Sequence, residues 1–275
     1  MAFLVLGAGF TGQRVAARLL AAGETVHVTT RDPARLAALP GARIHRLDVA
    51  DPGSLWALAS DLPRGLRVLH SVPVLEGEAG PFDPTPALLE ALGELPARVV
   101  YLSTTGVYGG QAVVDEKTEV APASARTRLR VEAERAVARG PWSWMVLRPA
   151  AIYGPGRGVH LSIASGRYRL AGDGSNFVSR IHVDDLAAVA VAALRSDEVG
   201  AFPVADLEPA RAREVAAFCA ARFGLPMPPS APPASLHETL RSDRRVDGRA
   251  IFRRLGVEPA FPTFREGIPA AAAAT

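Results

Sequence analysis

A glycine-rich segment near the start of the chain has the spacing of a phosphate-binding loop. Residues 7–12 read Gly-Ala-Gly-Phe-Thr-Gly, directly after the apolar run of residues 2–6 and before an amphipathic stretch. A G-x-G-x-x-G segment that joins a strand to a helix presents backbone N–H groups and the positive helix end to the phosphates of a dinucleotide. Five residues of this loop are predicted to contact the cofactor: Gly7, Gly9, Phe10, Thr11 and Gly12.

The end of the next apolar run indicates which dinucleotide is bound. NAD sites usually place an acidic residue there to hold the ribose 2′-hydroxyl, whereas this chain has Thr30 followed by Arg31. A guanidinium pairs with a 2′-phosphate, so Arg31 favours NADP over NAD. Asp32 stands before Pro33, where it is expected to cap a helix. Two further residues, Asp48 and Val49, end the third predicted strand, where they either bound the adenine or simply form a turn.

The first half of the chain alternates short apolar runs with helical patterns, which predicts an α/β fold with a parallel sheet. The predicted strands are residues 2–6, 25–29, 42–47, 67–71, 98–103 and 144–147. The predicted helices are residues 12–22, 33–39, 52–61, 84–95 and 124–139. Three of these helices begin with Asp-Pro, which places a capping carboxylate before a proline in the first turn.

The second half of the chain is less regular, with helices predicted over residues 184–194 and 211–223. We divide the chain into a dinucleotide-binding domain over residues 1–150 and a smaller region over residues 151–268 that interleaves with it. The final segment, residues 269–275, is almost entirely alanine and is expected to be a disordered tail.

Composition excludes several classes of protein. The chain has 275 residues, of which 48% are hydrophobic, and its formal net charge is only +3, with no dense basic run that would indicate nucleic-acid binding. No apolar stretch approaches the roughly 18 residues that a membrane helix needs. Cys219 is the only cysteine, which predicts no disulfide and a cytoplasmic location. No metal site is predicted.

Several motifs in order resemble the extended short-chain dehydrogenase/reductase superfamily, in its NAD-dependent epimerase/dehydratase group. After the glycine loop come Ser-Thr-Thr-Gly-Val-Tyr-Gly at residues 103–109 and Arg-Pro-Ala-Ala-Ile-Tyr-Gly-Pro-Gly at residues 148–156. Ile-His-Val-Asp-Asp-Leu follows at residues 181–186. The resemblance implies a Rossmann-type doubly wound sheet with a small C-terminal substrate lobe. It also implies a small-molecule substrate such as a nucleotide-sugar or another phosphorylated compound, and a homodimer through the helices near residues 84–95 and 124–139.

The resemblance also implies three catalytic positions, and two of them are altered. Thr104 takes the place of the family's Ser/Thr, which hydrogen-bonds the substrate oxygen. The family's Tyr-x-x-x-Lys pair falls on Arg126 and Arg130. A guanidinium stays protonated at any ordinary pH, so Arg126 cannot relay a proton as a phenol does. Because Lys117 is the only lysine, Arg130 follows the chain's general preference for arginine and is expected to keep a binding role.

Other side chains are candidates to complete the site. Tyr108, Tyr153 and Tyr168 are the tyrosines that could replace the missing phenol. A second set of residues, Arg157, Arg180 and Arg245, could form an anionic-ligand pocket, although solvated arginine is the simpler interpretation of each. The pair His182 and Asp185 is expected to anchor a helix rather than to act in catalysis.

Two functions from different classes therefore remain open. The chain is either an NADP-linked oxidoreductase or epimerase-type enzyme with altered catalytic residues, or a sensor that binds NADP(H) without turnover. The enzyme is favoured because the loops after Arg148 have the pattern of a second ligand-binding region.

Overall fold

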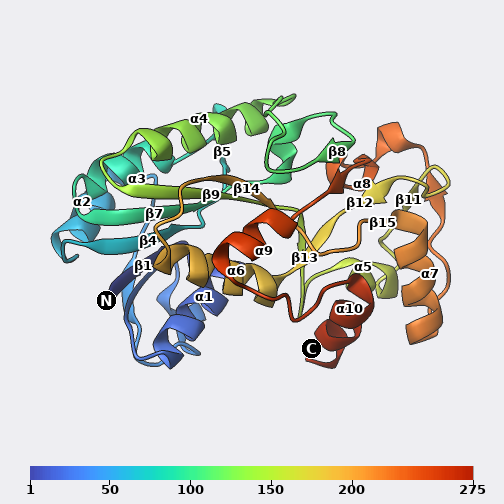
Figure 1. Ribbon diagram of the computed structural model, residues 1–275, viewed down its shortest axis with the longest axis horizontal. Helices are drawn as coiled ribbons and strands as arrows, with labels where there is room; N and C mark the ends of the chain where they lie inside the picture. Colours follow the sequence, from blue (N-terminus) through green and yellow to red (C-terminus); the bar gives the residue numbers. More distant parts are fainter. Residues whose placement is uncertain (275) are drawn as a thin grey trace.

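The computed structural model describes residues 1–274, and its centre is a seven-stranded parallel sheet (Figure 1). The strand order is β14-β9-β7-β4-β1-β2-β3, which reverses direction beside β1, as in a doubly wound sheet. The predicted α/β fold is therefore confirmed. The strands are β1 (Ala2–Leu6), β2 (Thr25–Thr30), β3 (Arg43–Arg46), β4 (Leu66–His70), β7 (Pro96–Leu102), β9 (Ser143–Pro149) and β14 (Gly200–Val204).

Helices cover both faces of this sheet (Figure 1). One face packs against α1 (Phe10–Ala21), α6 (Val183–Arg195) and α9 (Arg249–Leu255). The opposite face packs against α2 (Pro52–Ser60), α3 (Thr85–Leu92) and α4 (Ala125–Arg139). The central strands are apolar along their whole length because both faces are buried, and Phe3, Leu4, Val5 and Leu6 are all fully inaccessible to solvent.

A smaller lobe lies beside the sheet, at the right of Figure 1. Its strands pair only in twos, and its own apolar core is built mainly from α5, α7 and α10. The lobe contains β10 (Ala151–Tyr153), α5 (Val159–Ala164), β11 (Leu170–Ala171), β12 (Phe177–Val178), β13 (Arg180–His182), β15 (Ala210–Arg211), α7 (Ala212–Phe223), β16 (Ser230–Ala231), α8 (Glu238–Arg241), β17 (Arg245–Val246) and α10 (Phe264–Ala273). The chain returns from the lobe to the sheet twice, through α6 with β14 and through α9.

The helix starts follow the capping signals in the sequence. The carboxylates of Asp32 and Asp51 accept hydrogen bonds from the N–H groups two residues later, as expected before Pro33 and Pro52. The first of these elements is shorter than predicted, a 3₁₀ turn over Pro33–Leu36. At the start of α4, Ser124 forms a reciprocal capping box with Thr127.

Three expectations differ from the structure. The edge strand β14 was not predicted, because it contains Pro203 and a glycine, which weaken a strand pattern. The tail expected to be disordered is helical as far as Ala273, since a capping box of Thr263 and Glu266 starts α10 and alanine favours helix; Ala271 is buried, and Thr275 lies outside the described residues. The helix predicted over residues 84–95 is shorter, because α3 ends at Leu92 and the next residue, Gly93, has a φ of +51°.

No helix in residues 1–274 combines the length and the apolar character needed to span a membrane.

Candidate functional site

The glycine loop has the backbone geometry that a dinucleotide site requires. Gly7 has a φ of +83°, which favours glycine, and its N–H donates to Thr29 Oγ1 over 2.9 Å. A Cβ on Gly12 would lie 2.5 Å from the carbonyl oxygen of Gly7, so only glycine lets α1 pack this closely on the loop. Gly9 has open space around it, because no heavy atom of the described chain lies within 4 Å of the place that a Cβ would take. The loop can therefore accept a diphosphate over Gly9.

The amino end of α1 completes this anion site. Among residues 1–274, no side chain caps this end at Gly9, which leaves the first-turn N–H groups for a ligand. Two guanidinium groups lie over the ring of Phe10, with Arg14 at 4.3 Å and Arg157 at 5.3 Å from the ring centroid. The structure thus brings together the five loop residues predicted from the sequence. Thr29 is an additional residue of this site that sequence patterns did not reveal.

Arg31, at the end of β2, is exposed beside this loop. Thr30 Oγ1 hydrogen-bonds within the turn to the carbonyl oxygen of Asp32, and the Asp32 carboxylate accepts from the N–H of Ala34 over 3.1 Å. Asp32 therefore acts as the expected cap. Arg46 pairs in register with Thr30 on the neighbouring strand and is also exposed. Arg31 and Arg46 are thus two exposed arginines near the carboxyl ends of the neighbouring strands β2 and β3.

Asp48 and Val49 form the turn after β3. The Asp48 carboxylate accepts from the N–H of Ala50 over 3.1 Å, and its own N–H donates to Ser54 Oγ over 3.0 Å. Val49 packs against the core under α2 and α3. These contacts explain Asp48 as a turn residue, and its exposed position beside the loop still allows the adenine contact.

A cavity of about 640 Å³ separates the sheet from the lobe. Thr104 lies in its wall, two residues after the end of β7, and its Oγ1 accepts a hydrogen bond from the N–H of Gly106 over 3.1 Å. Because Oγ1 accepts that bond, its own proton is available to a substrate oxygen. On the opposite side, α8 and the following segment contribute Glu238, Arg241 and Asp243 to the wall.

None of the three tyrosines considered as substitutes reaches this cavity. Tyr108, Tyr153 and Tyr168 are all buried, and burial raises the pKa of each hydroxyl. Within the described part of the chain, the cavity wall contains no tyrosine, histidine, cysteine or lysine. Within the described residues, no other tyrosine therefore replaces the missing phenol in the cavity beside Thr104.

A buried ion pair supports the wall next to Thr104. Ser103 Oγ donates to Glu134 Oε1 over 2.5 Å, and Arg148 binds both carboxylate oxygens of Glu134, over 3.1 and 2.7 Å. The remaining Arg148 nitrogen, Nη1, donates to the hydroxyl of Tyr108 over 3.1 Å. Sequence patterns did not reveal Glu134. Glu134 follows Arg130 by four residues and therefore lies on the same face of α4, and this spacing could have indicated it as a site residue.

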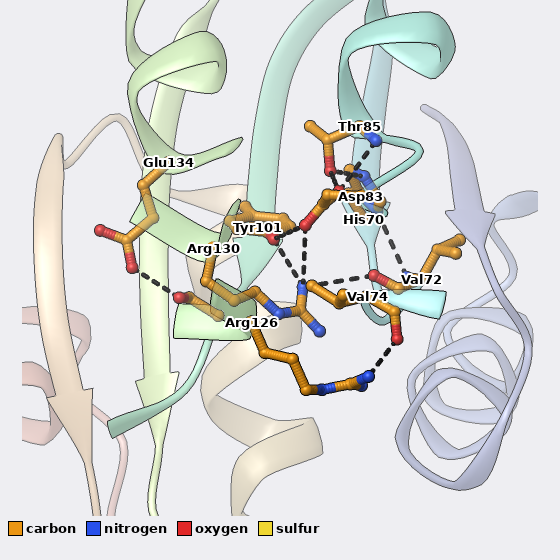
Figure 2. Close-up of polar contacts among 10 residues, drawn as sticks. His70, Val72, Val74, Asp83, Thr85, Tyr101, Arg126, Arg130 and Glu134 are labelled. Atoms are coloured by element: carbon orange, nitrogen blue, oxygen red, sulfur yellow. Dashed lines mark hydrogen bonds and ion pairs between the residues drawn. The ribbon is translucent and has the colours of Figure 1, made fainter. Parts of the chain in front are cut away.

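Arg126 does not line the cavity and contacts the hairpin that β5 (Leu75–Gly77) forms with β6 (Gly80–Phe82). Figure 2 shows its contact with Val74, just before this hairpin. Its Nη2 donates to the carbonyl oxygen of Val74 over 2.9 Å, and its Nη1 pairs with the carboxylate of Glu76. The guanidinium that stands in place of the family's phenol thus contacts the protein itself.

Arg130 is more deeply enclosed than Arg126 (Figure 2). Its Nη1 donates to the hydroxyl of Tyr101 over 2.5 Å and to the carbonyl oxygen of Val72 over 3.4 Å, and it lies 3.9 Å from Asp83 Oδ2. Neither Arg126 nor Arg130 lines the cavity that contains Thr104. Of the three predicted catalytic positions, Thr104 thus lies in the cavity wall, while Arg126 and Arg130 contact other residues of the protein.

The arginines proposed for an anionic pocket are also dispersed. Arg157 lines the cavity, whereas Arg180 is buried and donates to the carbonyl oxygen of Val178 over 2.6 Å. Arg245 is exposed and lies over the ring of Phe177. These three side chains do not form one pocket.

His182 and Asp185 anchor helix α6, as the sequence predicted. His182 Nδ1 accepts from the N–H of Asp184 over 3.2 Å at the start of the helix. The Asp185 carboxylate accepts from the N–H groups of Ala260 and Phe261 over 2.8 and 3.0 Å.

Comparison with known proteins agrees with this geometry. A family described as NAD(P)H-binding matches residues 7–197. A curated relative from Streptomyces, a 3-diazoavenalumate denitrifying reductase, is 33% identical over 161 residues, or 53% of this chain and 52% of the relative. The chain thus spans about half the length of that curated relative.

Two solved structures show the same fold over nearly the whole chain. A conserved protein of unknown function from Silicibacter pomeroyi is 32% identical with a TM-score of 0.82, covering 99% of this chain and 98% of that one. The UDP-glucose 4-epimerase of Thermotoga maritima, solved with UDP-glucose, is 19% identical with a TM-score of 0.84, covering 100% and 98%. The chain therefore has a Rossmann-type fold, and residues 7–197 match the NAD(P)H-binding family.

Proposed function

Because the chain belongs to the NAD(P)H-binding family, we propose that it is an NADP(H)-dependent reductase whose substrate lies beside Thr104. When bound, the reduced nicotinamide supplies the hydride. The observation that carries the proposal is the composition of the cavity wall: the Thr104 hydroxyl is present and a phenol is not, in the part of the chain described. In the family that this chain resembles, a tyrosine takes the proton from the sugar hydroxyl. Because the described cavity wall holds no tyrosine, it favours reduction over epimerisation by that route.

The substrate class follows from the missing proton donor. The curated relative, by its name, reduces a diazo compound with loss of nitrogen. Hydride addition to the carbon of an aryl diazonium group forms a C–H bond and breaks the C–N bond, whose electron pair leaves with N₂. No proton is needed in that step. We therefore propose a substrate that accepts hydride without protonation, and an aryl diazo compound is the first candidate.

The test is a substrate panel with NADPH deuterated at the transferred position. We expect NADPH oxidation with ortho-diazophenols, with deuterium at the carbon that carried nitrogen and release of N₂. We expect no interconversion of UDP-sugars. Epimerisation of a UDP-sugar without net cofactor oxidation would contradict the proposal, as would tight NADPH binding with no turnover on any member of the panel.

Thr104 is expected to orient the substrate through its free hydroxyl proton. Thr104→Val keeps the shape but removes the donor, so kcat should fall by about 100-fold. Thr104→Ser keeps the donor and should stay within about threefold of the wild type. Steady-state kinetics on the productive substrate measure kcat of both variants. Thermal unfolding measures the stability lost when the valine variant no longer accepts the hydrogen bond from the N–H of Gly106. Equal activity of the valine and serine variants would remove Thr104 from the reaction.

Arg31 is expected to select NADP over NAD. No ion pair involves Arg31 among residues 1–274, so its charge is available to a 2′-phosphate. Arg31→Ala should weaken NADPH binding by about 10-fold and leave NADH binding unchanged, as titration calorimetry would show. Arg64→Ala is the matched control, because Arg64 precedes β4 at the other end of the sheet. A parallel loss of affinity for NADH would contradict this role.

A further inference from the structure

Val72, the second residue after β4, is held at both of its backbone polar groups (Figure 2). Its N–H donates to His70 Nδ1 over 3.3 Å, and its carbonyl oxygen accepts from Arg130 Nη1 over 3.4 Å. Loops usually leave such groups to water. Here two side chains from different elements, one on β4 and one on α4, fix the position of a single loop residue.

These two contacts belong to one closed chain of hydrogen bonds, which we call the Val72 ring. It passes through five side chains drawn in Figure 2: His70, Thr85, Asp83, Tyr101 and Arg130. The ring joins strands β4 and β7 to helices α3 and α4. Four of its five side chains are almost completely buried, and Arg130 is 13% exposed. Its geometry is therefore protected from water.

The proton positions in the ring follow from its contacts. Since the Val72 N–H donates to Nδ1 of His70, the proton of this imidazole sits on Nε2, which donates to Thr85 Oγ1 over 2.8 Å. Burial lowers the pKa of His70 to about 4, so the imidazole is neutral at neutral pH. Thr85 and Tyr101 then donate to the two oxygens of Asp83, over 3.3 Å for Tyr101. Each side chain of the ring therefore donates a hydrogen bond to the next one or accepts one from it.

Val72 in turn forms one wall of the glycine loop. A Cβ on Gly7 would lie 3.1 Å from Val72 Cγ2 and 3.2 Å from its backbone nitrogen. Gly7 is the residue with the positive φ that begins the loop. A displacement of Val72 would therefore change the position of Gly7 and, with it, the N–H groups that face a diphosphate.

We propose that Tyr101 and Arg130 are positioning residues for the dinucleotide, acting through Val72 on Gly7. The arginine in the place of the family's lysine would then serve the cofactor indirectly, through the hydrogen bonds that its Nη1 donates to Tyr101 and Val72. This inference requires dinucleotide binding and is independent of the reaction proposed above.

The experiment measures cofactor affinity by titration calorimetry in four variants. Tyr101→Phe removes the hydroxyl that holds Arg130, and Arg130→Met removes the guanidinium. Each should weaken NADPH binding by about 10-fold, and the double variant should lose no more than either single one, because both break the same ring. Affinity for adenosine 2′-monophosphate should not change, since it lacks the diphosphate. Arg130→Lys should recover most of the affinity.

Two outcomes would overturn the proposal. If Tyr101→Phe lowers the melting temperature but leaves the NADPH affinity unchanged, the ring serves stability alone. If Arg130→Met weakens binding while Tyr101→Phe does not, Arg130 contacts the cofactor directly. Arg135→Met, on the exposed side of the same helix, controls for the loss of one charge. Loss of enzymatic turnover with cofactor affinity intact would count against the reductase, not against this proposal.

Discussion

Replacing Gly12 with alanine is expected to weaken NADPH binding by about 100-fold and to lower the free energy of unfolding by about 1–3 kcal/mol. The added Cβ would lie 2.5 Å from the carbonyl oxygen of Gly7 and 3.1 Å from Val5 Cγ1. Backbone and a buried strand residue cannot both move aside. Helix α1 must therefore shift away from the loop, which displaces the N–H groups that are predicted to bind the diphosphate.

Gly9→Ala is the informative comparison. Within the described chain no heavy atom lies within 4 Å of the added Cβ at Gly9, so the free energy of unfolding should stay within about 0.5 kcal/mol of the wild type. The methyl group would instead occupy the space of the diphosphate, and NADPH affinity should fall as in Gly12→Ala. Thermal unfolding with and without NADPH, together with calorimetric titration, separates the two effects. Unchanged affinity in Gly9→Ala would remove the diphosphate from this position.

The glycine loop could be predicted from the sequence because its function is a local backbone requirement. Gly7 and Gly12 lie five residues apart, and the contact between them depends on the loop alone. The capping roles of Asp32 and Asp51 were predicted for the same reason, since each carboxylate binds an N–H group two residues away. Structural features that depend on only a few consecutive residues can therefore be predicted from the sequence.

The contacts of Arg126 and Arg130 could not be predicted, because their partners are distant in sequence. Arg126 contacts Glu76, 50 residues earlier, and Arg130 contacts Val72, 58 residues earlier. The family motif predicts which positions on α4 belong to the site. It does not predict that residues of the hairpin already bind the guanidinium of Arg126. The arginine side chains are longer than the tyrosine and lysine of the family and can therefore reach these distant partners. Edge strand β14 was missed for a different reason, since Pro203 is tolerated only because one side of the strand is unpaired.

Replacing Glu134 with glutamine is expected to lower the free energy of unfolding by about 3–5 kcal/mol. Glu134 and Arg148 are both buried, and the carboxylate accepts two hydrogen bonds from the guanidinium and one from Ser103. The glutamine amide carries no charge, so the buried guanidinium of Arg148 loses its counter-ion. The amide NH₂ group would also face an N–H group of Arg148, which is itself a donor. Urea unfolding measures the change. Glu132→Gln, exposed on the same helix, should change the free energy of unfolding by less than about 0.5 kcal/mol.

The double variant Glu134→Leu with Arg148→Met distinguishes the cost of an unpaired charge from the value of the pair. Both charges are then absent, so the loss should shrink to about 1–2 kcal/mol, arising from the hydrogen bonds that Ser103 and Tyr108 lose. A double variant as unstable as Glu134→Gln would mean that the pair itself stabilises the fold. NADPH affinity provides a second test. Because the pair supports the cavity wall and not the glycine loop, the folded double variant should bind NADPH as the wild type does, while its kcat falls with the displacement of Ser103 next to Thr104.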